Sequence, residues 1–191
     1  MFQLAEIFYS IQGEGTWVGT PAVFVRLAGC NLSCAFCDTD YSLKFFATAR
    51  QIVEQVRDLG GDCPMIVLTG GEPFAQRATP SLIEALRADG RKVHVESNGT
   101  IAVELPADVW LTVSPKERLD PRMAARANEV KLIVDGRVPL EWLEHFPATT
   151  PMFLQPEGNK PANVALALEA AKAHPRRLRL SLQTHKFIGV R

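Results

Sequence analysis

The sequence predicts a single α/β domain over residues 1–191, built on a mostly parallel sheet. Seven apolar runs with strand-type residues recur along the chain, and amphipathic helix patterns separate several of them. Several runs consist almost entirely of valine, isoleucine and leucine, which suits strands covered on both faces. Strands that alternate with helices form right-handed βαβ units. No repeat, low-complexity block or linker interrupts this order, so we expect one domain.

The predicted strands cover residues 22–27, 65–69, 92–96, 109–113, 130–134, 151–155 and 178–182. The pattern assigns no element before Ala22. In parallel sheets of this kind, ligands bind at the carboxyl ends of the strands. We therefore expect the functional residues to follow the strands directly.

The helix patterns fall between the strands. Thr48 caps a helix that ends at Gly60, with Ile52, Val53, Val56 and Leu59 on its apolar face. A second helix begins at Thr79 and ends before Gly90, with Leu82, Ile83 and Leu86 inward.

Two further helices are expected over residues 139–146 and 161–174. The longer one carries Val164, Ala165, Leu168 and Ala171 on one stripe, which we expect to face the sheet. Residues 97–108 and 114–129 look too irregular for full helices. The sheet should therefore have fewer crossover helices than strands.

Composition excludes several classes of protein. The 21 basic residues balance the 21 acidic ones, which argues against a protein whose main task is to hold duplex nucleic acid or an anionic membrane. No uncharged apolar run is long enough to span a bilayer, and Glu6 interrupts the apolar core that a signal peptide would need. We expect a cytosolic protein, in which clustered cysteines bind metal or do redox chemistry more often than they form disulfides.

Three of the four cysteines form a C-x3-C-x2-C run, Cys30 to Cys37, directly after the first predicted strand. Three thiolates on one short loop can converge on a single metal centre. A four-iron cluster would leave one iron without a protein thiolate, free to bind a small molecule. The alternatives are unrelated core cysteines or a structural zinc site, which would need a distant fourth ligand from Cys63, His94 or His185.

The cysteine run resembles the signature of the radical S-adenosylmethionine (SAM) enzymes, and the TGGEP sequence at 69–73 resembles the GGEP motif of that superfamily. Further segments are similar to the 7-carboxy-7-deazaguanine synthase family. They are EIFYSIQGEG at 6–15, Gly19, FVRLAGC at 24–30, CDT at 37–39, ESNGT at 96–100, SPK at 114–116, KLIVD at 131–135, QPE at 155–157 and SLQTHK at 181–186. These segments run almost from one end of the chain to the other and are more selective than the cysteine spacing.

The resemblance implies a partial TIM-like barrel of about six parallel strands. It also implies a radical SAM lyase that converts 6-carboxy-5,6,7,8-tetrahydropterin to 7-carboxy-7-deazaguanine with loss of ammonia, a step toward queuosine. The implied cofactors are a [4Fe-4S] cluster, SAM and Mg²⁺. A flavodoxin is the usual electron donor for such clusters, and the family resemblance suggests a homodimer. Direct contact with nucleic acid or a membrane is not expected.

The resemblance also assigns residues. The cluster ligands would be Cys30, Cys34 and Cys37, and the Mg²⁺ ligand Thr39. Substrate contacts would come from Ile11, Gln12, Gly13, Arg26, Thr69 and Arg191. SAM contacts would come from Gly71, Glu72, Ser97, Asn98, Ser114, Pro115, Lys116, Gln155, Pro156, Glu157 and Gly158.

Some of these residues have simpler interpretations. Arg26 is either a bidentate clamp for the substrate carboxylate or an outward-facing residue on a half-exposed strand. Thr39 could instead cap a local turn. Arg191 could be a frayed terminus. Glu14 is a further candidate beside Gly13. His185 and Lys186 either line the site or close the sheet.

Other residues are expected to be structural. We expect Cys63 to be a small, partly buried thiol and His94 a packed strand histidine. The pair Arg176 and Arg177 is expected in a solvated turn, with contact to tRNA or a reductase as the alternative. Two other functions stay open: a radical SAM activating protein for a glycyl-radical partner, and a non-catalytic zinc-binding or iron-sensing module. The first has the same cysteine spacing but leaves SIQGEG and SLQTHK unexplained.

Overall fold

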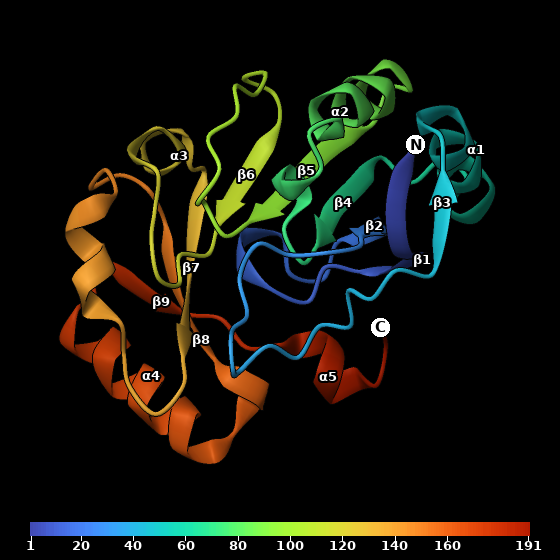
Figure 1. Cartoon of the computed structure of the whole chain (residues 1–191). Coiled ribbons are helices and arrows are strands. Elements are labelled where there is room, and N and C mark those ends of the chain that lie inside the picture. The colour runs from blue at the N-terminus through green and yellow to red at the C-terminus, as the bar shows by residue number, and fades with distance from the viewer.

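The sheet of the computed structural model, which describes all residues 1–191, has nine strands in the order β3-β1-β2-β4-β5-β6-β7-β8-β9 (Figure 1). Each pair of neighbours from β2 to β9 is parallel, whereas β1 runs antiparallel to both β2 and β3. The two outermost strands, β3 and β9, do not pair, so the curved sheet stays open. The mostly parallel, incomplete barrel is confirmed.

Every predicted strand is present with shifts of only one or two residues. The parallel strands are β2 (Pro21–Leu27), β4 (Met65–Gly70), β5 (Lys92–Ser97), β6 (Trp110–Val113), β7 (Glu129–Val134), β8 (Met152–Pro156) and β9 (Leu178–Leu180). The family resemblance implies about six parallel strands, and the short strand β9 is one more.

The sequence did not predict β1 (Phe2–Ile11) and β3 (Phe45–Ala47). The pairing of β1 with β2 is irregular between Leu4 and Glu6, so the alternation of apolar and polar residues changes phase within the strand. Pattern reading depends on an unbroken period of two. The strand β1 is therefore recognised by its pairing with β2 and not by the pattern of its own residues.

The helices are α1 (Ala49–Gly60), α2 (Thr79–Ala88), α3 (Pro121–Arg126), α4 (Pro161–Ala173) and α5 (Thr184–Ile188). Helices α1 to α4 pack on the outside of the sheet, whereas α5 lies on its inner side beside the cavity (Figure 1). The predicted cap of α1 is a full capping box between Thr48 and Gln51. The predicted helix over 139–146 is a 3₁₀ helix, Leu140–His145.

The predicted stripe of α4 is only partly inward: Ala171 packs against the core, whereas Ala165 and Leu168 are exposed. Ala167 is fully buried and Asn163 nearly so, whereas Leu168 is 43% exposed and Leu166 39% exposed. The helix is rich in alanine and apolar on nearly every side, so its periodicity does not select a face. Small side chains let α4 approach the sheet, and the Asn163 side chain accepts a hydrogen bond from the Gly136 amide.

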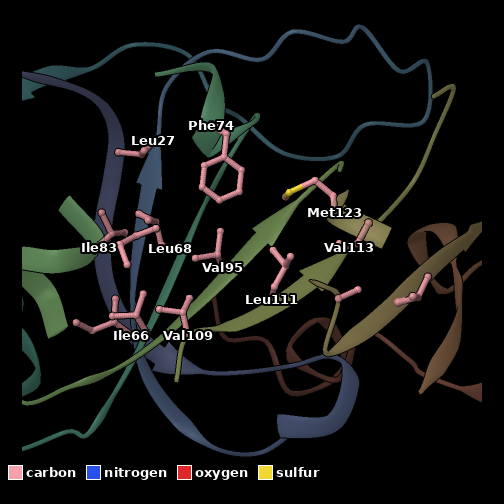
Figure 2. Close-up of a cluster of buried hydrophobic side chains, with 14 of the residues drawn as sticks. Leu27, Ile66, Leu68, Phe74, Ile83, Val95, Val109, Leu111, Val113 and Met123 are labelled. Atoms are coloured by element: carbon pink, nitrogen blue, oxygen red, sulfur yellow. The ribbon is translucent and has the colours of Figure 1, made fainter. Parts of the chain in front are cut away.

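The main core lies between the sheet and the outer helices (Figure 2). Ile66, Leu68, Val95 and Leu111 point outward from neighbouring strands and are essentially inaccessible to solvent. Each such side chain contributes about 1.5–3 kcal/mol to folding. The alternate positions point inward and are largely polar, but most of them are buried too, so these strands are covered on both faces as predicted. The inner face lines a cavity.

No helix combines the length and the apolar character needed to cross a membrane.

Candidate active site

A cavity of about 450 Å³ lies inside the curved sheet. Its walls come from the carboxyl ends of the parallel strands, from the loop between β2 and β3, and from the segment after β9. This is the location that the α/β organisation predicts.

Most of the predicted site residues meet here. The cavity is lined by Ile11, Gln12, Gly13, Arg26, Cys30, Cys34, Cys37, Thr39, Thr69, Gly71, Ser97, Asn98, Ser114, Lys116, Gln155, Glu157 and Arg191. Four predicted SAM contacts do not line it: Glu72, Pro115, Pro156 and Gly158. For Pro156, in β8, the strand period of two explains this, because its neighbour Gln155 points inward.

Glu72 lies behind the cavity wall rather than on its surface. Its side chain is fully buried, and its carboxylate accepts hydrogen bonds from the Ser97 hydroxyl (2.9 Å), the Asn98 amide (2.7 Å) and the Phe74 amide (3.1 Å). Burial raises the pKa of this carboxyl, although these donors oppose the shift. The carboxylate is therefore engaged within the protein, where it holds the loop after β5.

The three loop cysteines are free thiols on one wall of the cavity. Burial raises the pKa of Cys34, and the nearby Lys116 ammonium opposes this shift. No three His, Cys, Asp or Glu side chains lie close enough together to hold a single metal ion. A four-iron cluster binds each thiolate at a different iron, so it needs more widely spaced sulfurs than a zinc ion does. Three soft donors on one short loop fit such a cluster.

The fourth cysteine lies elsewhere. Cys63 is buried, and its thiol donates to the carbonyl groups of Pro21 (3.4 Å) and Met65 (3.6 Å). The expectation of a small structural thiol is confirmed.

Gly71, directly after β4, lets the end of this strand pack closely against the start of the cysteine loop. A β-carbon on Gly71 would lie 2.2 Å from the Gly29 carbonyl oxygen and 2.6 Å from the Cys30 β-carbon. No side chain has room there. The backbone of Gly71 therefore lies directly against the first cysteine.

Lys116 lies near the cysteine loop. Its ammonium group donates to the Ser114 carbonyl (3.0 Å) and lies 5.9 Å from the centre of the Phe36 ring. Burial, together with repulsion from Lys131, lowers its pKa to about 8. A carboxylate ligand would give this cation the partner that the protein does not supply.

A buried ionic triad lies deeper in the cavity. The Lys131 ammonium group bonds to both Glu14 and Glu96, and Gln12 donates to Glu96 (3.1 Å). Burial alone would lower the pKa of Lys131, but the attraction of the two carboxylates is stronger and raises it. Burial also opposes ionisation of Glu14, yet Lys131 keeps the pKa of that carboxyl below its usual value. Glu96 and Lys131 each begin a segment that resembles the family, but sequence analysis gave neither of them a role in the site, although each is a charged residue within an apolar strand.

Arg26 and Arg191 meet at the end of the cavity beside β1. The Glu6 carboxylate accepts from Arg26 Nε (2.8 Å) and lies 3.3 Å from Arg191 Nη2. The Ser10 hydroxyl donates to the main-chain oxygen of Arg191 (2.6 Å). Arg26 therefore does not face outward, and Arg191 is not frayed.

The segment after β9 crosses the cavity and reaches β1 (Figure 1). The Thr184 amide donates to the Gly13 carbonyl (3.0 Å), and the Gln183 side chain donates to Glu14 (3.1 Å). Lys186 pairs with Asp38 (2.5 Å) in the cysteine loop. His185 lies against Gly13, where a β-carbon would come within 2.1 Å of its ring. His185 and Lys186 both line the cavity.

Comparison with known proteins agrees with this site. Residues 25–116 match the model of the radical SAM superfamily. The chain is 40% identical over 191 residues to a 7-carboxy-7-deazaguanine synthase from Bacteroides thetaiotaomicron, covering all of both chains. It is 37% identical over 186 residues to the synthase from Aquifex aeolicus, covering 90% of this chain and 85% of the relative.

A solved structure also matches. The crystal structure of QueE from Escherichia coli superposes with a TM-score of 0.81 at 29% identity, covering 96% of this chain and 94% of the other. Full-length identity of this level, together with the shared fold, determines the family. The chain belongs to the radical SAM superfamily and, within it, to the 7-carboxy-7-deazaguanine synthases.

Proposed function

We propose that the protein converts 6-carboxy-5,6,7,8-tetrahydropterin to 7-carboxy-7-deazaguanine with loss of ammonia, a step toward queuosine. The observation that carries this proposal is one cavity lined by the three free thiols on one wall and by two arginines beside β1. The first feature suits a cluster that binds SAM, and the second suits a substrate with a carboxylate.

Cys30, Cys34 and Cys37 would hold the [4Fe-4S] cluster that the family uses. Together the cluster and SAM supply the radical chemistry, in which reductive cleavage of SAM leads to removal of a hydrogen atom from the substrate. The protein provides binding, orientation and exclusion of water. The Gly71 backbone, Ser97, Asn98, Ser114, Lys116, Gln155 and Glu157 would contact SAM, with Lys116 beside its carboxylate.

The substrate would lie against the opposite wall. Arg26 would bind its carboxylate in a bidentate manner. Ile11, Gln12 and Gly13 would contact the edge of the pterin ring, chiefly through backbone groups, and Thr69 would add a side-chain contact. The segment after β9 covers this part of the cavity and would keep water and stray hydrogen donors from the reacting carbon.

We also propose that Thr39 is a ligand of Mg²⁺. Thr39 lines the cavity two residues after Cys37, and its hydroxyl forms no hydrogen bond with another residue, so it does not cap a turn. A hydroxyl oxygen suits this hard cation, which would keep waters or substrate oxygens as its other ligands.

The protein is further proposed to be a homodimer that accepts electrons from a flavodoxin. Two exposed leucines on α4, Leu166 and Leu168, offer apolar surface that a second subunit could cover. Light scattering coupled to size-exclusion chromatography should give about twice the chain mass of 21.1 kDa. A mass near that of one chain would contradict the dimer.

The function is tested by anaerobic reconstitution, reduction, and incubation with SAM and carboxytetrahydropterin. We expect consumption of SAM and a product with the mass of carboxydeazaguanine. Cys34→Ala should lose the visible absorption of the cluster and SAM cleavage, whereas Cys63→Ala, whose thiol lies outside the cavity, should keep both. Cleavage of SAM without conversion of the pterin would favour an activating protein. A colourless protein that binds zinc in place of the cluster would contradict both enzyme functions, the synthase and the activating protein.

A further inference from the structure

The inner face of the β1-β2 hairpin carries a cluster of charged and aromatic side chains. Glu6, Phe8 and Ser10 are alternate residues of β1, and Glu6 pairs across the strands with Arg26 as Phe8 does with Phe24. Alternation places these side chains on one face. Glu6, Phe8, Phe24 and Arg26 all line the cavity.

Glu6 divides its carboxylate between two arginines from opposite ends of the chain. One oxygen accepts from Arg26 Nε at 2.8 Å, and the other lies 3.3 Å from Arg191 Nη2. Arg26 thus uses its Nε for Glu6, while its two terminal nitrogens form no hydrogen bond within the protein. Two parallel N–H groups of this kind match the two oxygens of a carboxylate.

The ring of Phe8 fixes the position of both guanidinium groups. The Arg26 guanidinium carbon lies 5.8 Å from the ring centre and that of Arg191 lies 5.5 Å from it. Phe8 is itself stacked on Phe24, with ring centres 4.9 Å apart and planes inclined by 4°. The bond from Ser10 to the main chain of Arg191 holds the end of the chain in place. Both guanidinium groups therefore lie against a stacked pair of aromatic rings.

The charges of these side chains are unbalanced, because two guanidinium groups share one carboxylate. We propose that Glu6 is a positioning residue that holds Arg26 and Arg191 together as a two-guanidinium site for the carboxylate of the substrate. This inference rests on the proposed function, to which it adds Glu6 and a role for the Arg191 side chain. Binding of a carboxylate would supply the missing negative charge.

A purely structural ion pair would predict something different. If Glu6 served only to attach the end of the chain, its removal would weaken binding of pterins with and without a carboxylate to the same extent, or would only lower thermal stability. A positioning role instead predicts a loss that depends on the ligand carboxylate. The test therefore compares two ligands that differ in this group alone.

The experiment measures binding of pterin-6-carboxylate and of unsubstituted pterin to the reconstituted holoenzyme with SAM, by the change in pterin fluorescence. Glu6→Gln should weaken pterin-6-carboxylate about tenfold, since hydrogen bonds to charged groups are involved, and should leave pterin unchanged. The KM for carboxytetrahydropterin should rise about as much while kcat stays within about twofold. Glu54→Gln, in the exposed ion pair with Arg50 on α1, is the matched control and should change neither ligand.

Arg191→Gln provides a second variant, because it removes the guanidinium and keeps the main-chain bond to Ser10. With its side chain 72% exposed, we expect a smaller selective loss of about threefold. Equal weakening of both pterins, or no weakening, in either folded variant would overturn the inference. If Glu6→Gln fails to fold, the comparison of the two pterins in Arg191→Gln tests the inference by itself. Failure of the wild-type enzyme to convert carboxytetrahydropterin would instead contradict the proposed function.

Discussion

Two buried lysines in the cavity carry opposite pKa shifts. Lys131 has two carboxylate partners that outweigh the effect of burial, so its pKa is raised. Lys116 has only oxygen atoms of Ser114 as acceptors and faces repulsion from Lys131, so burial lowers its pKa to about 8. Lys131 is therefore charged at any physiological pH, whereas Lys116 loses its proton in mildly alkaline solution.

This difference predicts a pH dependence of SAM binding. If Lys116 contacts the SAM carboxylate, affinity should fall as the pH rises through about 8, because only the protonated amine attracts an anion. The comparison is with Lys116→Arg, which stays charged but sees the same titration of the SAM amino group. Between about pH 7 and about pH 9, wild type should lose about tenfold more affinity than the variant. Parallel curves for the two proteins would contradict this contact.

His94 predicts a pH dependence of stability. It is 5% exposed and packs between Trp17 and Trp110, with ring centres 5.2 and 5.9 Å away, and burial lowers its pKa to about 4. Its expected role as a packed strand histidine is confirmed. Between pH 6.5 and about 4 the unfolded chain binds a proton that the native protein does not. Stability should therefore fall as the pH falls through this range.

The expected loss is about 2 kcal/mol after allowance for solvent screening. Urea unfolding at several pH values, followed by tryptophan fluorescence, measures it. The slope of unfolding free energy against pH should be smaller in His94→Gln than in wild type, whereas loss of the exposed His145 in His145→Gln should have little effect on it. An identical slope in His94→Gln and wild type would refute this explanation.

At the scale of elements, one arginine holds the connection into β8. The Arg177 guanidinium donates to five backbone carbonyls, those of Leu143, Phe146, Pro147, Ala148 and Thr150, at 2.8–3.3 Å. The expectation that Arg177 belongs to a solvated turn is wrong. Its adjacent partner, Arg176, is exposed as expected.

Removal of this contact should destabilise the fold. Arg177→Ala leaves several carbonyls without a donor and should cost about 2–3 kcal/mol of unfolding free energy. The neighbouring Arg176→Ala is the matched control and should change stability by less than about 0.5 kcal/mol. Urea denaturation of the two variants gives the comparison. Equal stability would show that solvent replaces the Arg177 bonds without cost.

The elements that the sequence predicts well are those whose signals are local. The capping box of α1, the apolar strands β4 to β8, and the cysteine loop each depend on residues close together in the chain. In α4, by contrast, the buried face is decided by how closely the helix can approach β8 and β9, which no local pattern records. The unpredicted β1 likewise depends on its pairing with β2.

At the scale of the whole molecule, the sequence places most of the proposed site but not the network that connects it. Strand order and curvature bring Glu14, Glu96 and Lys131 together from three distant segments, and no spacing in the chain encodes that meeting. The same holds for Glu6 and Arg191. Glu72 was assigned by motif alone, and only the folded structure reveals the hydroxyl and backbone donors that bond to its carboxylate.

The cavity as a whole separates two tasks. The cysteine loop and the ends of β4 to β8 surround the proposed cluster and SAM, whereas the β1-β2 hairpin and the end of the chain surround the proposed carboxylate site. If these regions act separately, damage to the second should spare the chemistry of the first. This separation is the central claim about how the fold supports the reaction.

The most direct test is the ratio of SAM cleaved to carboxydeazaguanine formed by Arg26→Ala. The variant removes the proposed carboxylate clamp and leaves the three cysteines intact. We predict that product formation falls by about a hundredfold or more at subsaturating substrate, because two charge-assisted hydrogen bonds are lost, while uncoupled SAM cleavage remains measurable. Equal loss of both activities in a folded, cluster-containing variant would contradict the account.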